Sequence, residues 1–131
     1  MNMTPEQLEM LKRLKDPIDG YMGEWKEGDL SYSLLSKRII FVDKEVCKFL
    51  KDPKEELFIK DNVLRIPSFC TPDGKRCLWG MLDEYKRKRL VNGNGYYKIV
   101  LTPTRLQSDK IYAATDPYTA VLKALCEQEG V

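Results

Sequence analysis

The chain opens with apolar residues at helical spacing. Three leucines fall on one face of a helix and are separated by polar or charged residues: Leu8, Leu11 and Leu14. Thr4 supplies an N-cap hydroxyl, and Gln7, three residues later, completes a capping box. This pattern predicts a helix over residues 4–14. Asp16 and Pro17 predict its end, because a proline disfavours helical backbone in the residue before it.

The next stretch is rich in short β-prone runs. Residues 20–28 favour turns, and residues 37–42 (KRIIFV) form a β-branched and aromatic run bounded by charge, which predicts a strand. Residues 45–50 fit either an extension of that strand or a short helix, ended by the Asp-Pro pair at 52–53. Three further short strands are predicted, the last two as a hairpin: residues 30–35, 56–59 and 62–66.

The second half of the chain begins with a turn. Residues 71–74 (TPDG) place proline and glycine where a β-turn favours them. A helix is predicted over residues 76–91, because Leu78 and Leu82 share one face of it, and residues 92–95 (NGNG) are expected to form its C-cap and a flexible turn. Two strands and a capped C-terminal helix complete the pattern: residues 96–101, 104–113 and 116–128.

The order of these elements indicates the fold class. Strands cluster instead of alternating strictly with helices, which favours an α+β fold over a doubly wound parallel sheet. The expected architecture is a small, mostly antiparallel sheet with an N-terminal, a middle and a C-terminal helix. A chain of 131 residues with 43% hydrophobic content is long enough for one buried core, so residues 1–131 are expected to form a single domain.

The composition excludes several kinds of catalytic site. The chain has no histidine, which removes Ser–His and Cys–His nucleophile pairs and the usual zinc catalysts. Asp43 and Glu45, or Asp83 and Glu84, are close in sequence, but residues one or two apart diverge on a helix. Residues 93–95 (GNG) precede a strand, whereas phosphate loops precede a helix. No catalytic residue and no cofactor is predicted, and an enzyme that uses carboxylates or a cysteine is a distant alternative.

Four cysteines are spread along the chain without a CxxC pair: Cys47, Cys70, Cys77 and Cys126. Residues 1–14 lack the apolar core of a signal peptide, and no stretch approaches the ~20 apolar residues of a membrane-spanning helix. We therefore expect a cytoplasmic protein with reduced thiols and no membrane partner. A disulfide framework is the alternative, and the spacings do not fit the two close pairs of a zinc site, so no metal is predicted.

Local clustering of basic residues raises the question of nucleic-acid binding. The chain carries 22 basic and 20 acidic residues, a net charge of +2, and this balance gives no global field that attracts phosphate. Six basic residues nevertheless gather near several aromatic ones: Lys75, Arg76, Lys86, Arg87, Lys88 and Arg89. The simpler interpretation is a solvated last helical turn, whose cations favour the negative end of the helix dipole. Nucleic-acid binding through these residues is kept as the alternative function.

Aromatic residues give the preferred functional prediction. Tyrosine and tryptophan are enriched at protein interfaces, where both the ring and its polar atom find partners. Four of them are candidates for a protein-binding surface: Trp25, Trp79, Tyr96 and Tyr97. The predicted partner is another protein or a second copy of the chain.

Several segments together resemble a known group of proteins. They are the helical start at residues 4–8 (TPEQL), residues 23–29 (GEWKEGD), residues 64–67 (LRIP), residues 78–82 (LWGML) and the closing residues 117–125 (PYTAVLKAL). In these the chain resembles small uncharacterised proteins that bacteriophages and bacterial prophages encode. The resemblance implies a non-enzymatic accessory product of a mobile element and assigns no activity to any residue. The basic run at 86–89 departs from the pattern.

Overall fold

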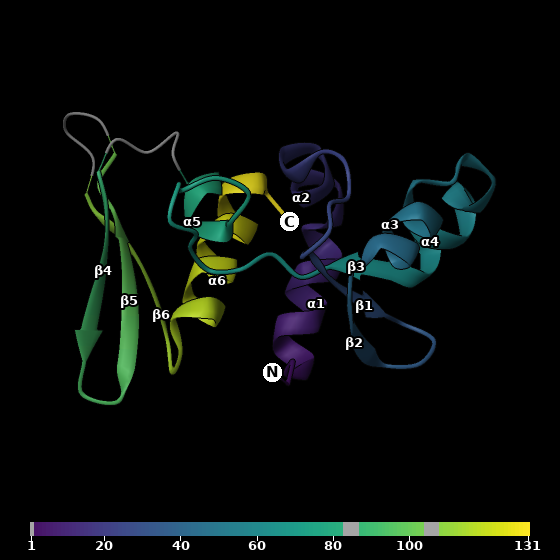
Figure 1. Ribbon diagram of the computed structural model, residues 1–131. Coiled ribbons are helices and arrows are strands. Elements are labelled where there is room, and N and C mark those ends of the chain that lie inside the picture. The colour runs from purple at the N-terminus through teal and green to yellow at the C-terminus, as the bar shows by residue number, and fades with distance from the viewer. Residues whose placement is uncertain (1, 83–86, 104–107) are drawn as a thin grey trace. The chain divides into compact units, whose positions relative to one another are not determined.

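The computed structural model describes residues 2–82, 87–103 and 108–131 of the chain. Across these residues the fold is α+β, as expected, with six helices and two three-stranded antiparallel sheets (Figure 1). The internal contacts divide the chain into two compact units. Unit 1 comprises residues 1–14 and 68–131, and unit 2 comprises residues 15–67. A single domain over residues 1–131 stays a prediction, and each unit is described by itself.

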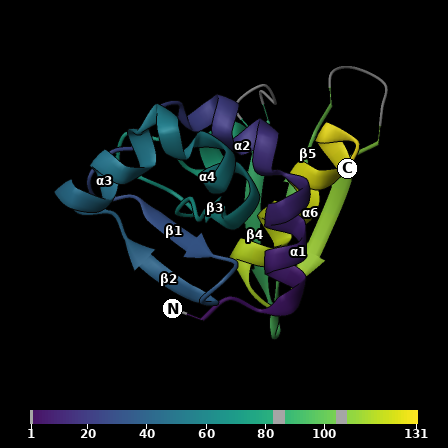
Figure 2. The same cartoon turned by 90° about the vertical axis from the view of Figure 1, so that its right-hand side faces the viewer.

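The N- and C-terminal helices form the helical layer of unit 1. Helix α1 (Pro5–Arg13) has the expected capping box, in which Thr4 accepts from the backbone of Gln7 and the Gln7 side chain accepts from Thr4. Helix α6 (Pro117–Glu129) contacts α1, as Figure 2 shows. Most of α6 is buried, and its buried residues include Ala120, Val121, Leu122, Ala124 and Leu125.

A three-stranded sheet forms the second layer of unit 1. Strands β4 (Lys88–Gly93), β5 (Tyr96–Leu101) and β6 (Lys110–Ala114) lie in the order β4-β5-β6, with both pairs antiparallel. One face of the sheet packs on α6, and its central residues are buried: Ile99, Leu101 and Tyr112. The Gln128 amide of α6 donates to the Tyr112 hydroxyl at 3.3 Å, which ties the two layers together.

The middle helix is much shorter than the sequence predicts. Helix α5 spans only Leu78–Met81, and residues 88–93 of the predicted helix form strand β4. The remaining residues 83–86 lie outside the described part of the chain. The buried leucines at 78 and 82 do mark one helical turn, but the helix does not extend to residue 91, because Leu90 and Val91 pair with β5. Residues 92–95 are therefore the end of a β4–β5 hairpin and not a helix C-cap, with Gly95 at φ +76°.

Unit 2 begins with helix α2 (Lys15–Met22), which starts directly after α1 ends. Asp16 and Pro17 were expected to end helical structure, but they lie in the first turn of α2. A proline is tolerated there, because the first backbone N–H groups of a helix have no intrahelical acceptor.

The sheet of unit 2 has the order β2-β1-β3. Both strands predicted at residues 30–35 and 37–42 form, as β1 (Leu30–Ser33) and β2 (Arg38–Phe41), and they pair as an antiparallel hairpin. Strand β3 (Val63–Arg65) then pairs antiparallel with the other side of β1.

The segment between β2 and β3 is helical. Helix α3 (Lys44–Lys51) resolves the ambiguity over residues 45–50, and a short 3-10 helix (Pro53–Glu55) leads into helix α4 (Glu56–Asn62). The predicted hairpin over residues 56–66 is wrong, because residues 56–59 are helical and β3 pairs with β1 instead. The reason is tertiary: α3 and α4 close a small core over β3, where six residues pack together: Trp25, Val42, Cys47, Leu50, Ile59 and Val63.

Candidate functional site

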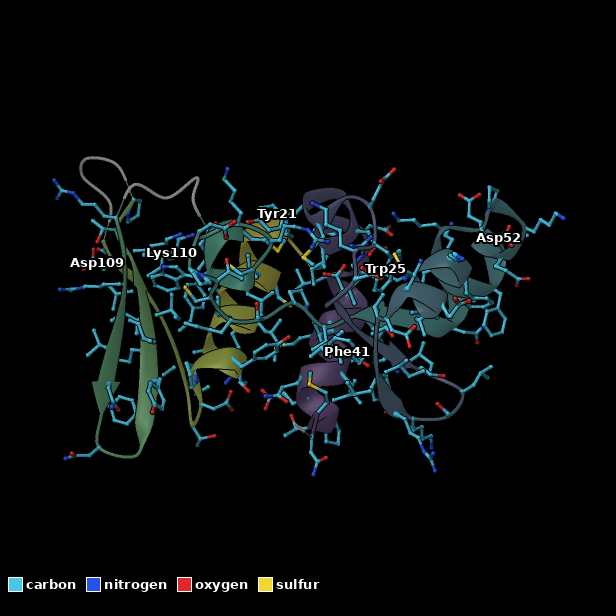
Figure 3. The ribbon with its side chains drawn as sticks, viewed as in Figure 1. Tyr21, Trp25, Phe41, Asp52, Asp109 and Lys110 are labelled. Carbon is cyan, nitrogen blue, oxygen red and sulfur yellow. The ribbon has the colours of Figure 1, made fainter. Side chains whose placement is uncertain are left out.

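The four aromatic residues of the predicted protein-binding surface do not form one surface. Trp25 belongs to unit 2 and lies in its core beside α3, 8% exposed (Figure 3). The other three belong to unit 1. Tyr96 and Tyr97 are neighbours on β5, so their side chains stand on opposite faces of the sheet.

Trp79 is half-buried within unit 1. Its ring lies against Phe69, with the ring centroids 5.7 Å apart. The Lys88 ammonium lies 5.0 Å from the Trp79 ring centroid and donates to the Trp79 carbonyl at 2.6 Å. These contacts give Trp79 a packing role and hold the Lys88 charge beside it.

One face of the β4–β5–β6 sheet is turned away from α6, and we call it the outer face. The strand register places eight residues on it: Arg89, Val91, Gly93, Tyr96, Lys98, Val100, Ile111 and Ala113. Ile111 is 56% exposed, Val91 39% and Tyr96 37%, whereas Val100 is buried. The outer face therefore presents large apolar side chains to solvent.

Tyr96 lies flat on this face because of its partner across the hairpin. Gly93 pairs with Tyr96, and a Cβ at Gly93 would come within 2.7 Å of the Tyr96 ring. The ring thus covers the space that the glycine leaves, an arrangement that compensates a glycine in a strand. The Tyr96 ring also contacts Lys98, whose ammonium lies 5.1 Å from the ring centroid.

Positive charge accompanies the apolar residues of the outer face. Of the basic residues of β4 and β5, Arg89 and Lys98 lie on this face, and neither strand carries an acidic residue. Arg87 is exposed and precedes β4, where its carbonyl accepts from Thr102, so it continues the alternation that places Arg89 on the outer face. Asp109, at the start of β6 (Figure 3), lies 3.9 Å from Arg89. Because both side chains are exposed, this ion pair holds Arg89 only weakly.

The predicted basic cluster is distributed over different environments. Arg87 and Arg89 belong to the outer face, whereas Lys88 points to Trp79. Lys75 follows the turn at residues 71–74 and its carbonyl accepts from the Thr71 hydroxyl, and Arg76 has a left-handed backbone with φ 53°. Lys86 lies outside the described residues. The helical interpretation of the run was wrong, because residues 88 and 89 alternate across a strand.

Unit 2 contains a pocket of about 650 Å³. Its walls come from α2, the loop after α2, the end of α3 with the following turn, α4 and β3. The lining is Lys15, Asp16, Asp19, Gly23, Trp25, Leu50, Lys51, Asp52, Pro53, Glu56, Ile59, Lys60 and Arg65. A volume of this size falls in the range of small-ligand sites.

A network of charged side chains is built into the wall of this pocket. The Arg65 guanidinium lies over the Trp25 ring, 4.2 Å from its centroid, and donates to the Gly23 carbonyl. Arg65 Nε and Asp19 Oδ1 are 3.0 Å apart, and Lys15 Nζ lies 3.6 Å from Asp19 Oδ2. Lys15 also donates to the Val63 carbonyl at 2.7 Å. Two cations from α2 and β3 therefore converge on one carboxylate.

The cysteines show no bond to one another. All four are free thiols, with Cys70 exposed and the other three buried. Burial raises the pKa of the Cys126 thiol, which the nearby charge of Arg13 partly offsets. Cys77 is the N-cap of α5 and its sulfur accepts from the Gly80 backbone. Within the described residues no three histidine, cysteine or acidic side chains are grouped so that they could hold a metal ion.

The carboxylates considered as candidate acid–base pairs show no paired arrangement among the described residues. Asp43 caps α3, where its side chain accepts from Val46. Asp83 and Glu84 lie outside the described residues. Hydrogen bonds from the Lys75 backbone and the Thr71 hydroxyl lower the pKa of Asp73. This carboxylate is fully exposed in a turn, so the shift reflects turn geometry.

Several residues of the outer face and of the pocket were not predicted from the sequence. Val91 lay in the predicted helix and Ile111 in the strand predicted over residues 104–113, where the alternation of side chains along β6 was the available signal. Arg65, Asp19 and Lys15 left no signal, because residues on different elements meet only in the folded unit.

No helix among the described residues is long and apolar enough to cross a membrane. Comparison of the chain with known protein families, curated proteins and solved structures finds no match.

Proposed function

We propose that the protein is a non-enzymatic binding module, and that the outer face docks a partner protein with acidic residues around an apolar centre. The observation that carries this proposal is the composition of the outer face. Ile111, Val91 and Tyr96 are exposed on this face, one from each strand, and Arg89 and Lys98 lie on the same face. Protein interfaces combine an apolar and aromatic centre with arginine and a polar rim.

The positive charge of the outer face favours binding of a different protein over association with a second copy of this chain. Two copies that met face to face would bring Arg87, Arg89 and Lys98 toward their own counterparts, and like charges across an interface cost free energy. A partner with carboxylates matches this surface. The resemblance to phage and prophage proteins supports the same accessory role, in which the protein acts by contact with a host or phage component.

Nucleic acid is the second candidate, and one observation favours it. The exposed Tyr96 ring contacts the Lys98 ammonium, with Arg89 farther along the same face, and single-stranded nucleic acid binds to exposed aromatic rings flanked by cations. Against it, the described outer face has one exposed aromatic residue, while Ile111 and Val91 offer no stacking surface. We therefore place the protein partner first.

Selection from a random peptide display library tests the proposal. We expect the recovered peptides to be rich in acidic and apolar residues and to bind with micromolar affinity that weakens at high salt. Ile111→Asp and Arg89→Glu should each weaken binding by at least about tenfold, since each removes part of the outer face. Single-stranded DNA and RNA oligonucleotides are measured in parallel.

Matched control variants come from unit 2. Leu35→Asp changes an apolar side chain that is 67% exposed, and Arg38→Glu reverses an exposed charge on β2. Both should leave peptide binding unchanged. The proposal fails if no recovered peptide depends on Ile111 and Arg89, or if an oligonucleotide binds through Arg89 more tightly than any peptide does.

A further inference from the structure

The pocket of unit 2 carries an inference that is independent of the proposed function, because it involves other residues in the other unit. Its most buried charged side chains are cationic. The Arg65 side chain is 6% exposed and the Lys15 side chain 18%, whereas Asp19 is 38% exposed. The inner wall therefore offers N–H donors and positive charge, and the carboxylate that pairs with them lies nearer to solvent.

These donors are already held in place in the free protein. Trp25 supports the guanidinium plane of Arg65, and the Gly23 carbonyl accepts from one of its ends. The Val63 carbonyl holds the Lys15 ammonium at 2.7 Å. Binding of a ligand would therefore cost little conformational entropy, because these side chains are already ordered in the free protein. An arginine has five N–H donors, so it serves several oxygen atoms at once.

An apolar wall stands beside the cationic one. Leu50 from α3 and Ile59 from α4 line the pocket together with Trp25, and all three belong to the core of the unit. A site with one charged end and one apolar wall selects a ligand with the same two parts.

The rim limits the charge of that ligand. Lys51 and Lys60 line it, but so do Asp16 and Glu56, and all four side chains belong to exposed residues. A polyphosphate would meet these carboxylates and be repelled, whereas a single negative charge at the inner end would meet one carboxylate, Asp19, together with the two cations Arg65 and Lys15.

We propose that the pocket formed by α2, α3, α4 and β3 binds a small carboxylate attached to an apolar group, with the carboxylate at Arg65 and Lys15 and the apolar group against Leu50 and Ile59. The carboxylate belongs either to a free small molecule or to the C-terminus of a peptide chain. Both sources present the same chemistry to the pocket.

Fluorescence of Trp25 tests this directly. In the full chain with Trp79→Phe, Trp25 is the remaining tryptophan and lines the pocket. N-acetyl-leucine should change its emission saturably, and N-acetyl-leucinamide, which lacks the charge, should bind at least about tenfold more weakly. Acetate and inorganic phosphate, which lack the apolar group, should also be weak. The proposal is overturned if the acid and the amide act alike, or if the acid gives no response up to about 10 mM.

Variants locate the binding. Lys15→Met should weaken N-acetyl-leucine binding by about tenfold because it removes one cation of the inner wall. Lys48→Met is the matched control, since Lys48 lies on α3, is exposed and does not line the pocket. Equal affinity of both variants would overturn the assignment. Arg65→Lys keeps the positive charge but loses the planar guanidinium with its several N–H donors. This variant, if it folds, should bind N-acetyl-leucine more weakly.

A peptide that ends in leucine distinguishes the two sources. If it binds like N-acetyl-leucine and its amidated form does not, the pocket accepts a chain terminus. If N-acetyl-leucine alone binds, the ligand is a free small carboxylate. Chemical shift changes on titration should be confined to the lining of unit 2, and a response spread over both units would contradict the site.

Discussion

Tyr118 shows how burial of a single titratable group couples stability to pH. Its phenol lies in the second position of α6 and is buried, and this desolvation raises its pKa above the ordinary value of 10.0. The native protein therefore keeps the proton at a pH at which the unfolded chain has lost it. Stability from this group is complete below pH 10 and falls as the pH rises further.

Tyr118→Phe removes this dependence. Above pH 10 the free energy of unfolding of the wild type should fall faster than that of the variant, by up to about 1.4 kcal/mol per pH unit. Urea unfolding at pH 8 and pH 11, followed by circular dichroism, measures the difference. All other ionisable groups are the same in the two proteins, so their effect cancels in the comparison. Parallel losses in the two proteins would show that Tyr118 is not the responsible group.

Arg65 shows a different residue-scale effect. A guanidinium is costly to bury unless it is paired, and Asp19, Gly23 and the Trp25 ring together meet that requirement. The contacts that stabilise the Arg65 charge also hold the guanidinium in one orientation. The same side chain can therefore stabilise unit 2 and bind the proposed ligand.

At the scale of elements, α6 depends on its first turn. Asp116 accepts from the Thr119 backbone and from the Thr119 hydroxyl, both at 2.7 Å, and lies 3.4 Å from the Gln7 amide of α1. The Gln7 amide also donates to the Thr119 hydroxyl at 3.0 Å. One carboxylate thus begins α6 and links it to α1.

Asp116→Ala should lower the free energy of unfolding by about 2 kcal/mol, because it removes the cap and leaves buried donors of Thr119 and Gln7 less satisfied. Asp43→Ala is the comparison. Asp43 caps α3 through a hydrogen bond to Val46, and its loss should cost about 1 kcal/mol. Chemical denaturation measures both variants. Equal losses would mean that the link to α1 adds nothing to the cap.

At the scale of the whole molecule, the two units are expected to differ in stability. Unit 2 comprises residues 15–67 and closes over a small group of core residues. Small units bury a lower fraction of their surface and are only marginally stable. Unit 1 has the larger buried core, in which α6 and β5 contribute most of the fully buried side chains. We therefore expect unit 2 to unfold at a lower urea concentration than unit 1.

One tryptophan in each unit reports this difference. Trp25 follows unit 2 in Trp79→Phe, and Trp79 follows unit 1 in Trp25→Phe. Urea unfolding followed by fluorescence should give two different midpoints, and Leu50→Ala should lower the midpoint seen by Trp25 and leave that seen by Trp79 unchanged. Coincident midpoints in all variants would instead support a single cooperative domain.

The sequence by itself determined the elements whose signals are local. The capping box at Thr4 and Gln7, the strand at Tyr96–Leu101 and the capped helix Pro117–Glu129 were all predicted from neighbouring residues, and the structure confirms them. The α+β class followed from the order of these elements. Caps, turns and β-branched runs act over three or four residues, so they are visible in the chain itself.

Tertiary structure decided whatever depends on pairing partners. Residues 56–62 are helical and residues 88–93 are a strand because α4 covers the core of unit 2 and β4 pairs with β5. The outer face arises from the register of three strands, and the pocket arises where α2 and β3 bring Lys15 and Arg65 to one carboxylate. Residues far apart in sequence meet only after the chain has folded, because burial and strand pairing override local preference.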